Sequence, residues 1–250
     1  MNKTSEWTSR TELLLGQQGM DRLAAAHVLV VGTGGVGAYA AEMLARAGVG
    51  HLTLVDADTV QPSNINRQLC ALHSTIGQHK VEVLAARYKD INPGLQVHAI
   101  DRFIDEQEAE RLVATGGFDF IVDAIDTIAP KCALIAAAMR HKVRIVSSMG
   151  AGAKTDITQI RFADLWDTYH CGLSKAVRSR LKRMGLRRPL PVVFCTQQAD
   201  TRSVVQVSGE RNKKTTTGTV SYMPAVFGCY LAQYVIMRLS GARSPHPEEL

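Results

Sequence analysis

A short apolar run that ends in a glycine-rich turn constrains the fold of this chain more than any other feature. The segment HVLVVGTGGVGAYAAEML, residues 27–44, predicts a buried strand, a tight turn and a helix. Gly32, Gly34 and Gly37 fit the pattern G-x-G-x-x-G, in which backbone N–H groups and the start of the helix approach phosphate oxygens. The turn therefore predicts a nucleotide site, although it does not distinguish NAD from ATP.

Strands and helices alternate along the chain up to about Gly150. Short β-branched segments and helix-forming segments take turns, and proline or glycine ends most of the helices. Strands are expected over 27–31, 51–58, 95–100, 118–125 and 143–150, and helices over 38–48, 77–93, 105–117 and 129–141. Because such alternation builds parallel sheets through right-handed crossovers, we predict an α/β fold with a doubly wound, Rossmann-like and mostly parallel sheet.

The pattern changes after Gly152. Two strand-like segments, 156–165 and 202–209, have no comparably clear helix between them. We expect them to pair as antiparallel strands at the edge of the sheet, with the residues between them as a long excursion. An apolar helix is expected from about Val220. We predict a single domain over 1–250, with a nucleotide-binding core at 9–152, edge strands and a basic segment at 153–219, and a C-terminal helix at 220–240.

Positive charge is concentrated in one part of the second half. The formal net charge is +6, yet the chain has no acidic residue between Asp167 and Asp200. Without the seven basic residues of that interval the charge would be −1, because 6 − 7 = −1. A basic segment on a nearly neutral body suggests a polyanionic partner, and a solvated surface face is the alternative. These seven residues are Lys175, Arg178, Arg180, Lys182, Arg183, Arg187 and Arg188.

The five cysteines form no CxxC pair and show no close Cys/His spacing of the kind that binds a metal. We therefore expect neither a disulfide framework nor a zinc site, and reduced thiols indicate a cytoplasmic location. The N-terminal residues are polar and do not resemble a secretory signal. Residues 223–237 are apolar but shorter than the roughly 20 residues that span a bilayer. They predict a buried helix, with membrane association of this helix as the minor alternative.

A polar cluster directly after the second strand favours ATP over NAD. Asp56 stands at the tip of that strand, where a carboxylate accepts hydrogen bonds from ribose hydroxyls. The following residues, DADTVQPSNINRQL, suit a site that orients a triphosphate, and a dehydrogenase has little use for them. Arg67 offers a planar fork for phosphate oxygens, and Asn64 and Gln68 offer neutral hydrogen bonds. A single asparagine or glutamine at such a position, considered alone, is more often a residue of a turn than a ligand-binding residue.

Two further residues complete the predicted site. Lys80, at the start of a helix, can place a positive charge over phosphates, or it can simply face solvent. Asp126 follows the fourth strand, at the edge of the sheet where ligands bind. Its carboxylate could hold Mg²⁺ on the phosphates, and its alternative role is the N-cap of the next helix.

Four separated motifs together resemble the adenylating family related to ubiquitin-activating enzymes, which includes the ThiF and MoeB proteins. The motifs are GTGGVG, DADTVQPSNINRQ, GQHKVE and DAIDT, and the resemblance covers roughly Ser9 to Gly152. It implies that ATP and Mg²⁺ are bound and that a carboxylate is adenylated, with Arg67, Lys80 and Asp126 as the catalytic residues. It also implies a homodimer, because Arg10 matches an arginine that enters the partner subunit's ATP site. The nucleotide-binding set is Arg10, Gly32, Gly34, Gly35, Gly37, Asp56, Asp58, Asn64, Arg67, Gln68, Lys80 and Asp126, with Asp126 also the metal ligand.

The second half narrows the resemblance to one branch of that family. The chain has no cysteine pairs for zinc and no room for a thioester domain, whereas its segment TGTVSYMPAVFG resembles the tRNA threonylcarbamoyladenosine dehydratases. That branch implies ATP-dependent adenylation of the carboxylate of threonylcarbamoyladenosine in tRNA, followed by cyclisation. The resemblance assigns tRNA binding to the seven basic residues together with Arg211, Lys213 and Lys214, and a loop of this kind is expected to order on binding.

Three other functions stay open from the sequence. The first is activation of a ubiquitin-like sulfur-carrier protein. The second is a nicotinamide-dependent dehydrogenase, which only the glycine turn supports. The third is a nucleotide-gated adaptor for sulfur-trafficking partners, and a cysteine desulfurase or sulfur acceptor is a possible partner in any case. Cys171, Cys195 or Cys229 could carry a covalent step, although buried free cysteine is the commoner outcome.

Overall fold

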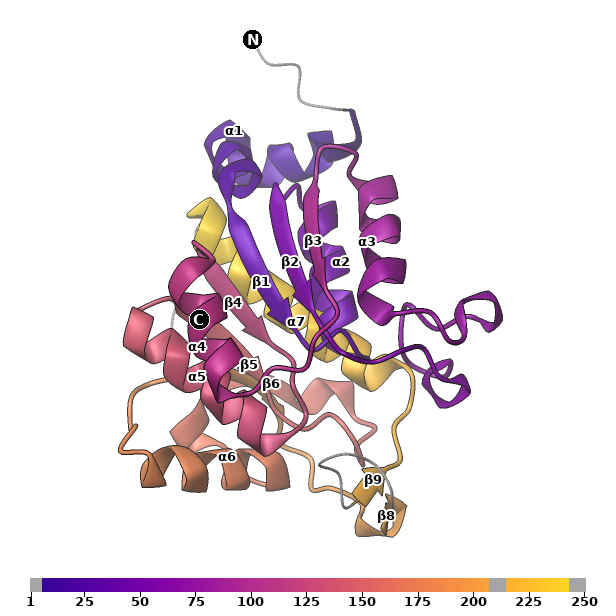
Figure 1. Ribbon diagram of the computed structural model, residues 1–250, viewed down its shortest axis with the longest axis vertical. Helices are drawn as coiled ribbons and strands as arrows, with labels where there is room; N and C mark the ends of the chain where they lie inside the picture. The colour runs from indigo at the N-terminus through magenta and orange to yellow at the C-terminus, as the bar shows by residue number, and fades with distance from the viewer. Residues whose placement is uncertain (1–5, 207–214, 243–250) are drawn as a thin grey trace.

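A computed structural model describes residues 6–206 and 215–242 of the chain. Its core is a sheet covered by helices (Figure 1). The sheet has seven strands in the order β3-β2-β1-β4-β5-β7-β6, and β6 alone runs antiparallel to its neighbour. This arrangement confirms the predicted doubly wound, mostly parallel fold. The strands are β1 His27–Val31, β2 His51–Val55, β3 Gln96–Ile100, β4 Phe120–Asp123, β5 Arg144–Ser148, β6 Ile160–Asp164 and β7 Pro191–Cys195.

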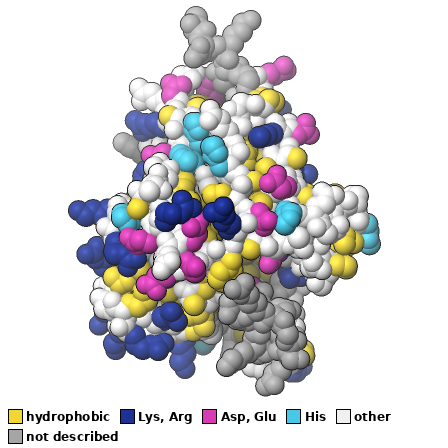
Figure 2. Space-filling view, viewed as in Figure 1, with side chains coloured by type: hydrophobic (Ala, Val, Ile, Leu, Met, Phe, Trp, Pro, Cys, Tyr) yellow, Lys and Arg dark blue, Asp and Glu magenta, His cyan; other side chains and the backbone are white. Residues whose placement is uncertain are grey.

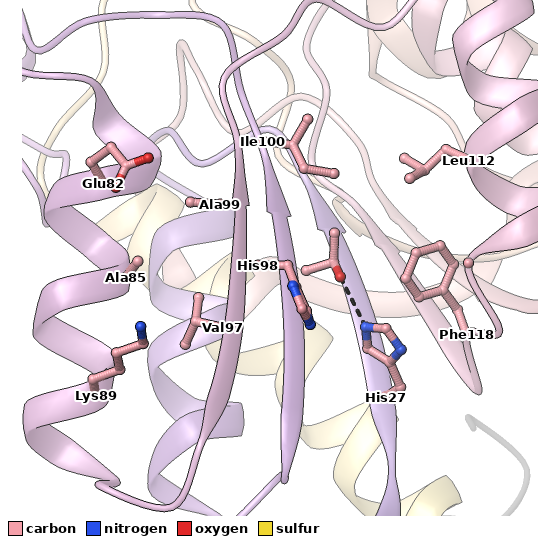
Figure 3. A pocket seen from close by; sticks show the side chains of 12 residues that line it. His27, Glu82, Ala85, Lys89, Val97, His98, Ala99, Ile100, Leu112 and Phe118 are labelled. Atoms are coloured by element: carbon pink, nitrogen blue, oxygen red, sulfur yellow. Dashed lines mark hydrogen bonds between the residues drawn. The ribbon is translucent and has the colours of Figure 1, made fainter.

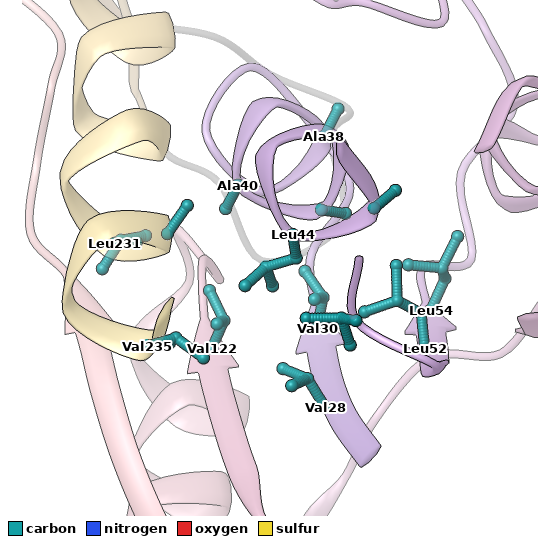
Figure 4. Close-up of a cluster of buried hydrophobic side chains, with 14 of the residues drawn as sticks. Val28, Val30, Ala38, Ala40, Leu44, Leu52, Leu54, Val122, Leu231 and Val235 are labelled. Atoms are coloured by element: carbon teal, nitrogen blue, oxygen red, sulfur yellow. The ribbon is translucent and has the colours of Figure 1, made fainter. Parts of the chain in front are cut away.

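Helices cover both faces of the sheet, because alternate residues of its central strands point to opposite sides. Val28 and Val30 of β1 pack in one apolar cluster, and Leu29 and Val31 pack in another. The first cluster lies under α2 and α7 (Figure 4). The helices on that face are α1 Ser9–Ala25, α2 Gly37–Arg46, α3 Lys80–Ile91 and α7 Tyr222–Ser240, and those on the other face are α4 Glu106–Thr115, α5 Ile128–His141 and α6 Gly172–Arg183.

The edge of the sheet differs from the sequence-based expectation. The basic segment is not an excursion, because its first part is helix α6 and the apolar run after it is strand β7. β7 lies between β5 and β6 and pairs antiparallel with β6. The strand expected over 202–209 is the short β8, Val204–Gln206, which pairs with β9, Thr215–Thr217, in a separate ribbon. The predicted pairing of 156–165 with 202–209 was therefore wrong.

The central strands β1 and β4 lie side by side, and the chain leaves them in opposite directions. From β1 the chain continues outward to β2 and β3, whereas from β4 it continues to β5 on the other side. In such sheets ligands bind beyond the carboxyl ends of the strands at this switch point. The glycine turn follows β1 and Asp126 follows β4, so the fold places both at the switch point.

α7 packs tightly against the start of α2, where the glycine turn ends. A Cβ placed on Gly228 would lie 2.5 Å from the carbonyl oxygen of Val36, so glycine is needed for this helix contact. The helix is apolar on most sides because it lies between α1, α2 and the sheet. None of the described helices is long and apolar enough to cross a membrane.

A cavity of about 580 Å³ lies away from the glycine turn, around the β3 edge of the sheet, and is lined by α3 as well as by the face that carries α4 (Figure 3). Its lining includes His27 and His98 from the strands and Phe118, which precedes β4. The ring of His27 lies 2.8 Å from the hydroxyl of Thr53. His27 stands at the start of β1, whereas ligands in this kind of fold bind beyond the opposite ends of the strands, so the cavity is distinct from the predicted nucleotide site.

We expect this histidine cluster to make the protein sensitive to acid. Burial, reinforced by His51 and His98 and opposed by Asp119, lowers the pKa of His27 below its usual value. The unfolded chain therefore takes up a proton first as the pH falls, and stability decreases from about pH 6.5 down to the lowered folded pKa. Urea unfolding between pH 5 and 8 measures this slope. The variant His27→Gln should have a flatter profile, and an unchanged slope would contradict the assignment.

Candidate active site

Two glycines of the turn are fixed by contacts with neighbouring backbone. Gly32 has a positive φ of 85°, and a Cβ on it would lie 2.8 Å from the carbonyl oxygen of Ala124. A Cβ on Gly37 would lie only 1.8 Å from the carbonyl oxygen of Gly32. These two residues therefore allow the start of α2 to approach the end of β1 and the loop after β4.

The other two glycines face the polar cluster that follows β2. A Cβ on Gly34 would lie 3.6 Å from Nε2 of Gln68, and one on Gly35 would lie 3.5 Å from Cγ of Arg67. On its other side Gly35 is covered by α7, since the same Cβ would lie 3.1 Å from Cβ of Pro224. The structure thus brings together four residues that the sequence predicted to share one site.

Asp56 ties the end of β2 to the glycine turn. Its Oδ2 accepts hydrogen bonds from the backbone N–H of Thr33 at 2.6 Å and from the Thr33 hydroxyl at 3.1 Å. Its Oδ1 accepts a hydrogen bond from the N–H of Asp58 at 2.9 Å. The carboxylate is therefore held at the edge of the turn, where the sequence placed it, and its contact with ribose stays a prediction.

Lys80 is buried and paired with a carboxylate. Its side chain is 4% exposed, and its Nζ lies 2.7 Å from Oδ2 of Asp58, which is largely exposed. The alternative of a lysine that faces solvent is therefore wrong. An ammonium group has three N–H donors, so two remain for other acceptors after the bond to Asp58. Asp58 consequently fixes the direction in which Lys80 presents its charge.

The loop between β2 and α3 is shaped by its own side chains. Asn64 is buried, and its Oδ1 accepts a hydrogen bond from the N–H of Gln61 at 3.1 Å, which holds the short helix Pro62–Asn64. The guanidinium of Arg67 donates to the carbonyl of Ser63 at 2.9 Å and to Asn66 at 2.8 Å. Asn64 therefore stabilises the fold of the loop. Arg67 is held on the surface of the loop, beside Gly35.

Asp126 lies in the exposed loop between β4 and α5. The N-cap of α5 is Thr127, so Asp126 stands one residue before the N-cap position. The loop touches the glycine turn through Ala124, which contacts both Gly32 and Gly37. No group of three His, Cys, Asp or Glu side chains in the described ranges is arranged to hold a metal by itself. A single carboxylate beside a phosphate site still suits Mg²⁺, which usually binds one or two carboxylates together with phosphates and water.

Arg10 is the predicted site residue that lies elsewhere. It stands in the first turns of α1, at the end of the sheet opposite to the glycine turn (Figure 1). A Cβ on Gly48, just beyond α2, would lie 3.8 Å from the methyl carbon of nearby Thr8. Since the ten residues of α2 are about 15 Å long, Arg10 does not belong to the nucleotide site of its own chain.

The basic segment forms an ordered surface on α6 and the loop after it. Six of the seven basic side chains are exposed, and dark blue side chains gather over α6 in Figure 2. Arg178 is the exception, because its guanidinium donates to the carbonyl oxygens of Leu165 and Thr168 and so has a structural role. The expectation that this segment is a loop that orders on binding was wrong for 172–183. Arg211, Lys213 and Lys214 lie outside the described residues.

The candidate cysteines are scattered, and all five thiols are free. Cys171 precedes α6 and lies beside Gly150, at the carboxyl end of β5. Burial raises the pKa of Cys171, but hydrogen bonds from Ser174 and Gly150 and the charge of Lys154 outweigh it, so the net pKa is lowered. Cys195 is buried, and Cys229 is exposed on α7. A covalent role for any of them stays a prediction.

Comparison with known proteins agrees with this fold. Residues 8–249 match the ThiF family. The chain is 38% identical over 238 residues to a tRNA threonylcarbamoyladenosine dehydratase of Bacillus subtilis, covering 92% of this chain and 93% of the relative. It is 34% identical to the crystal structure of TcdA, the Escherichia coli enzyme of the same name, in complex with ATP, with a TM-score of 0.86 and coverage of 94% and 93%.

The chain belongs to the ThiF family. A more distant match is a molybdopterin-synthase adenylyltransferase of Escherichia coli, which is 36% identical over 153 residues, with coverage of 61% of each chain. The likeness to the dehydratases thus extends beyond the nucleotide-binding half, into the part that contains α6, β7 and α7.

Sequence reasoning missed one group of buried polar residues at this ThiF-family site. Asp123 at the end of β4 and Lys131 in α5 are both fully buried and 2.8 Å apart, and the hydroxyl of Ser147 donates to Asp123 at 2.6 Å. The available signal was Lys131 itself, the one charged residue within the otherwise apolar run APKCALIAAAM. A charge in such a run is rarely buried without a partner.

Proposed function

We propose that this chain is an ATP-dependent tRNA threonylcarbamoyladenosine dehydratase, which adenylates the carboxylate of the modified nucleoside and promotes its cyclisation. The main support is the similarity to the tRNA threonylcarbamoyladenosine dehydratase of Bacillus subtilis, which extends over more than nine-tenths of both chains. The sequence motifs supply the second support, because the structure gathers the glycine turn, Arg67, Gln68 and the Lys80–Asp58 pair at one edge of the sheet.

The chemistry needs activation because a carboxylate has no good leaving group. One carboxylate oxygen attacks the α-phosphorus of ATP, the bond to the β-phosphate oxygen breaks, and pyrophosphate leaves. The carbamoyl group of the same nucleoside then attacks the acyl adenylate, AMP leaves with the bonding electrons, and one proton is released. Ring closure is intramolecular and therefore benefits from a high effective concentration. The net change in the nucleoside is the loss of one water.

The chain's residues act on this reaction by position and charge. The backbone N–H groups of the turn and the start of α2 would bind the phosphates, and Arg67 and Lys80 would offset their negative charge. Asp126 would hold Mg²⁺, which offsets charge on the phosphate oxygens as the bond to pyrophosphate breaks. Asp56 would accept hydrogen bonds from the ribose. These groups leave no requirement for a nucleophile from the protein.

We further propose that the active form is a homodimer in which Arg10 enters the site of the partner subunit. Leu13 and Leu14 are 87% and 85% exposed on α1, next to Arg10. Adjacent exposed leucines on one helix are expected at a contact between proteins rather than in water. The position of Arg10, remote from the glycine turn of its own chain, fits the same arrangement.

The exposed basic side chains of α6 would bind the tRNA backbone. α6 begins beside the ends of β5 and β7, because Cys171 lies next to Gly150 and the ring of His170 lies 3.0 Å from the carbonyl oxygen of Thr196. The basic surface therefore starts at the same edge of the sheet as the nucleotide site. A tRNA held there would present its modified loop towards the carboxyl ends of the strands.

The proposed activity can be tested on nucleosides. Purified protein is incubated with tRNA that contains threonylcarbamoyladenosine, with and without ATP, and the digested nucleosides are analysed by mass spectrometry. We expect a mass loss of one water on that nucleoside only when ATP is present. An unchanged mass together with ATP–pyrophosphate exchange that depends on a ubiquitin-like carrier protein would indicate the alternative function.

The tRNA surface makes a separate prediction. The double variant Arg180→Ala/Arg183→Ala should bind tRNA roughly tenfold more weakly. Its affinity should also depend less on salt, because each lost phosphate contact lowers the slope of log affinity against log salt concentration by about one. Filter binding at several salt concentrations measures both. Lys89→Ala/Arg111→Ala removes the same charge from α3 and α4 and serves as the control. Equal affinities for the two double variants would exclude α6 as the tRNA site.

A further inference from the structure

The buried pair of Asp123 and Lys131 lies directly behind the loop that carries Asp126. Both side chains have no solvent exposure, and Nζ of Lys131 lies 2.8 Å from Oδ2 of Asp123. The same oxygen accepts a hydrogen bond from Ser147 on the neighbouring strand β5. The pair thus joins the end of β4, the first turns of α5 and β5.

Both members of the pair also bind the backbone of one loop residue. Nζ of Lys131 donates to the carbonyl oxygen of Ile125 at 2.8 Å, and the N–H of Ile125 donates to Oδ1 of Asp123 at 3.1 Å. The two polar groups of the Ile125 backbone are therefore fixed from the protein interior. Asp126 is the next residue, so its Cα starts from a position that the pair determines.

The outer side of the same loop is fixed by the glycine turn. A Cβ on Gly32 would lie 2.8 Å from the carbonyl oxygen of Ala124 and 3.2 Å from the nitrogen of Ile125, and a Cβ on Gly37 would lie 3.1 Å from Cβ of Ala124. The loop is thus held between the turn on one side and the ion pair on the other. Any shift of Ile125 changes the position of Asp126 relative to the turn.

Stability alone does not account for an ion pair at this place. Two charges lose their hydration on burial, and well-packed apolar residues often stabilise a fold equally well. The specific contribution of Lys131 is its third contact, the hydrogen bond to the carbonyl oxygen of Ile125, which an apolar side chain cannot make.

We infer that Lys131 is a positioning residue, which acts through Ile125 to hold Asp126 where a Mg²⁺ ion on the bound ATP can be reached. The inference rests on the proposed role of Asp126 in the ATP site. Lys131 then contributes to the gain in ATP affinity that Mg²⁺ provides, and it does not contribute to the contacts between ATP and the glycine turn. Residues around a metal ligand commonly change metal affinity by about 10- to 100-fold when they are replaced.

The test is ATP binding by calorimetry with and without Mg²⁺, in the wild-type protein, Lys131→Met and Asp126→Ala. We expect Mg²⁺ to tighten binding in the wild type, and both variants to lose about tenfold of this gain. Affinity for metal-free ATP should stay within about twofold of wild type in Lys131→Met. Lys154→Met is the matched control, since Lys154 is equally buried but donates to the carbonyl oxygen of Cys195.

The possible results separate the inference from the proposal beneath it. If Asp126→Ala loses the Mg²⁺ gain and Lys131→Met keeps it, the inference is wrong and the role of Asp126 stands. If Asp126→Ala keeps the gain, both are wrong. Should Lys131→Met fail to fold, Asp123→Asn/Lys131→Met removes both charges. Its amide oxygen can still accept from the N–H of Ile125, its amide nitrogen can donate to the hydroxyl oxygen of Ser147, and it should lose the same gain. Equal losses with and without Mg²⁺ would indicate a purely structural role and overturn the inference.

Discussion

Replacing Asp126 with asparagine is expected to slow tRNA-dependent ATP–pyrophosphate exchange by on the order of 10³-fold. A metal on the phosphates contributes several kcal/mol to the transition state, and each 1.4 kcal/mol is a factor of ten in rate. Asparagine has the same shape as aspartate but lacks the negative charge that attracts Mg²⁺. Because Asp126 lies in an exposed loop, one residue before the N-cap position of α5, and asparagine keeps an acceptor oxygen, the folded structure should survive the change.

The exchange assay should be run over a range of Mg²⁺ concentrations, with thermal unfolding as the check on folding. Asp90→Asn is the control, since it removes an exposed carboxylate from α3, away from the switch point. We expect Asp90→Asn to match the wild type. If Asp126→Asn keeps its activity to within about threefold, the transition state does not depend on this carboxylate and the metal assignment fails.

Replacing Arg10 with alanine should also nearly abolish adenylation, by on the order of 10²-fold, as for the loss of one charged donor at a developing negative charge. The residue lies far from the glycine turn of its own chain, so the loss would come from the partner's site. Mixing provides a direct test. After subunit exchange between Arg10→Ala and Asp126→Asn proteins, each mixed dimer contains one site with both native residues.

Random exchange makes about half of the dimers mixed, and each has one intact site of two, so about a quarter of the wild-type activity should return. The two variants alone, treated in the same way, provide the baseline. Absence of recovery despite confirmed exchange would show that Arg10 and Asp126 serve the same chain. Wild-type activity in Arg10→Ala by itself would remove Arg10 from the site altogether.

The first half of the fold could be predicted because its signals are local. Each strand from β1 to β5 is a short β-branched or apolar run, and each is separated from the next by a helix with recognisable ends. The edge of the sheet could not be predicted in the same way. The apolar positions of α6, Val177 and Leu181, lie among so many charges that the helix was not recognised, and strand β7 begins at a proline, Pro191.

The candidate site likewise has one part that local motifs predict and another part that depends on tertiary packing. Gly34, Gly35, Arg67 and Gln68 could be grouped from their motifs, because the carboxyl ends of neighbouring parallel strands meet at one edge. The pairing of Lys80 with Asp58, and the burial of Lys131 against Asp123, depend on tertiary packing over 22 and 8 residues of separation. Neither ion pair follows from a repeating pattern in the sequence, so only the structure could show that carboxylates hold Lys80 and Lys131 in place.

Pro224 lies in α7, the last helix on the face of the sheet that also carries α1, α2 and α3. It contacts Gly35, which lies in the turn after β1. During synthesis the N-terminal part of a chain leaves the ribosome first and begins to fold before the rest exists. The glycine turn is then already made, but its cover is missing until α7 has emerged. A growing chain of this protein therefore lacks this cover of the proposed nucleotide site until α7 has emerged, after every strand of the seven-stranded sheet has been made.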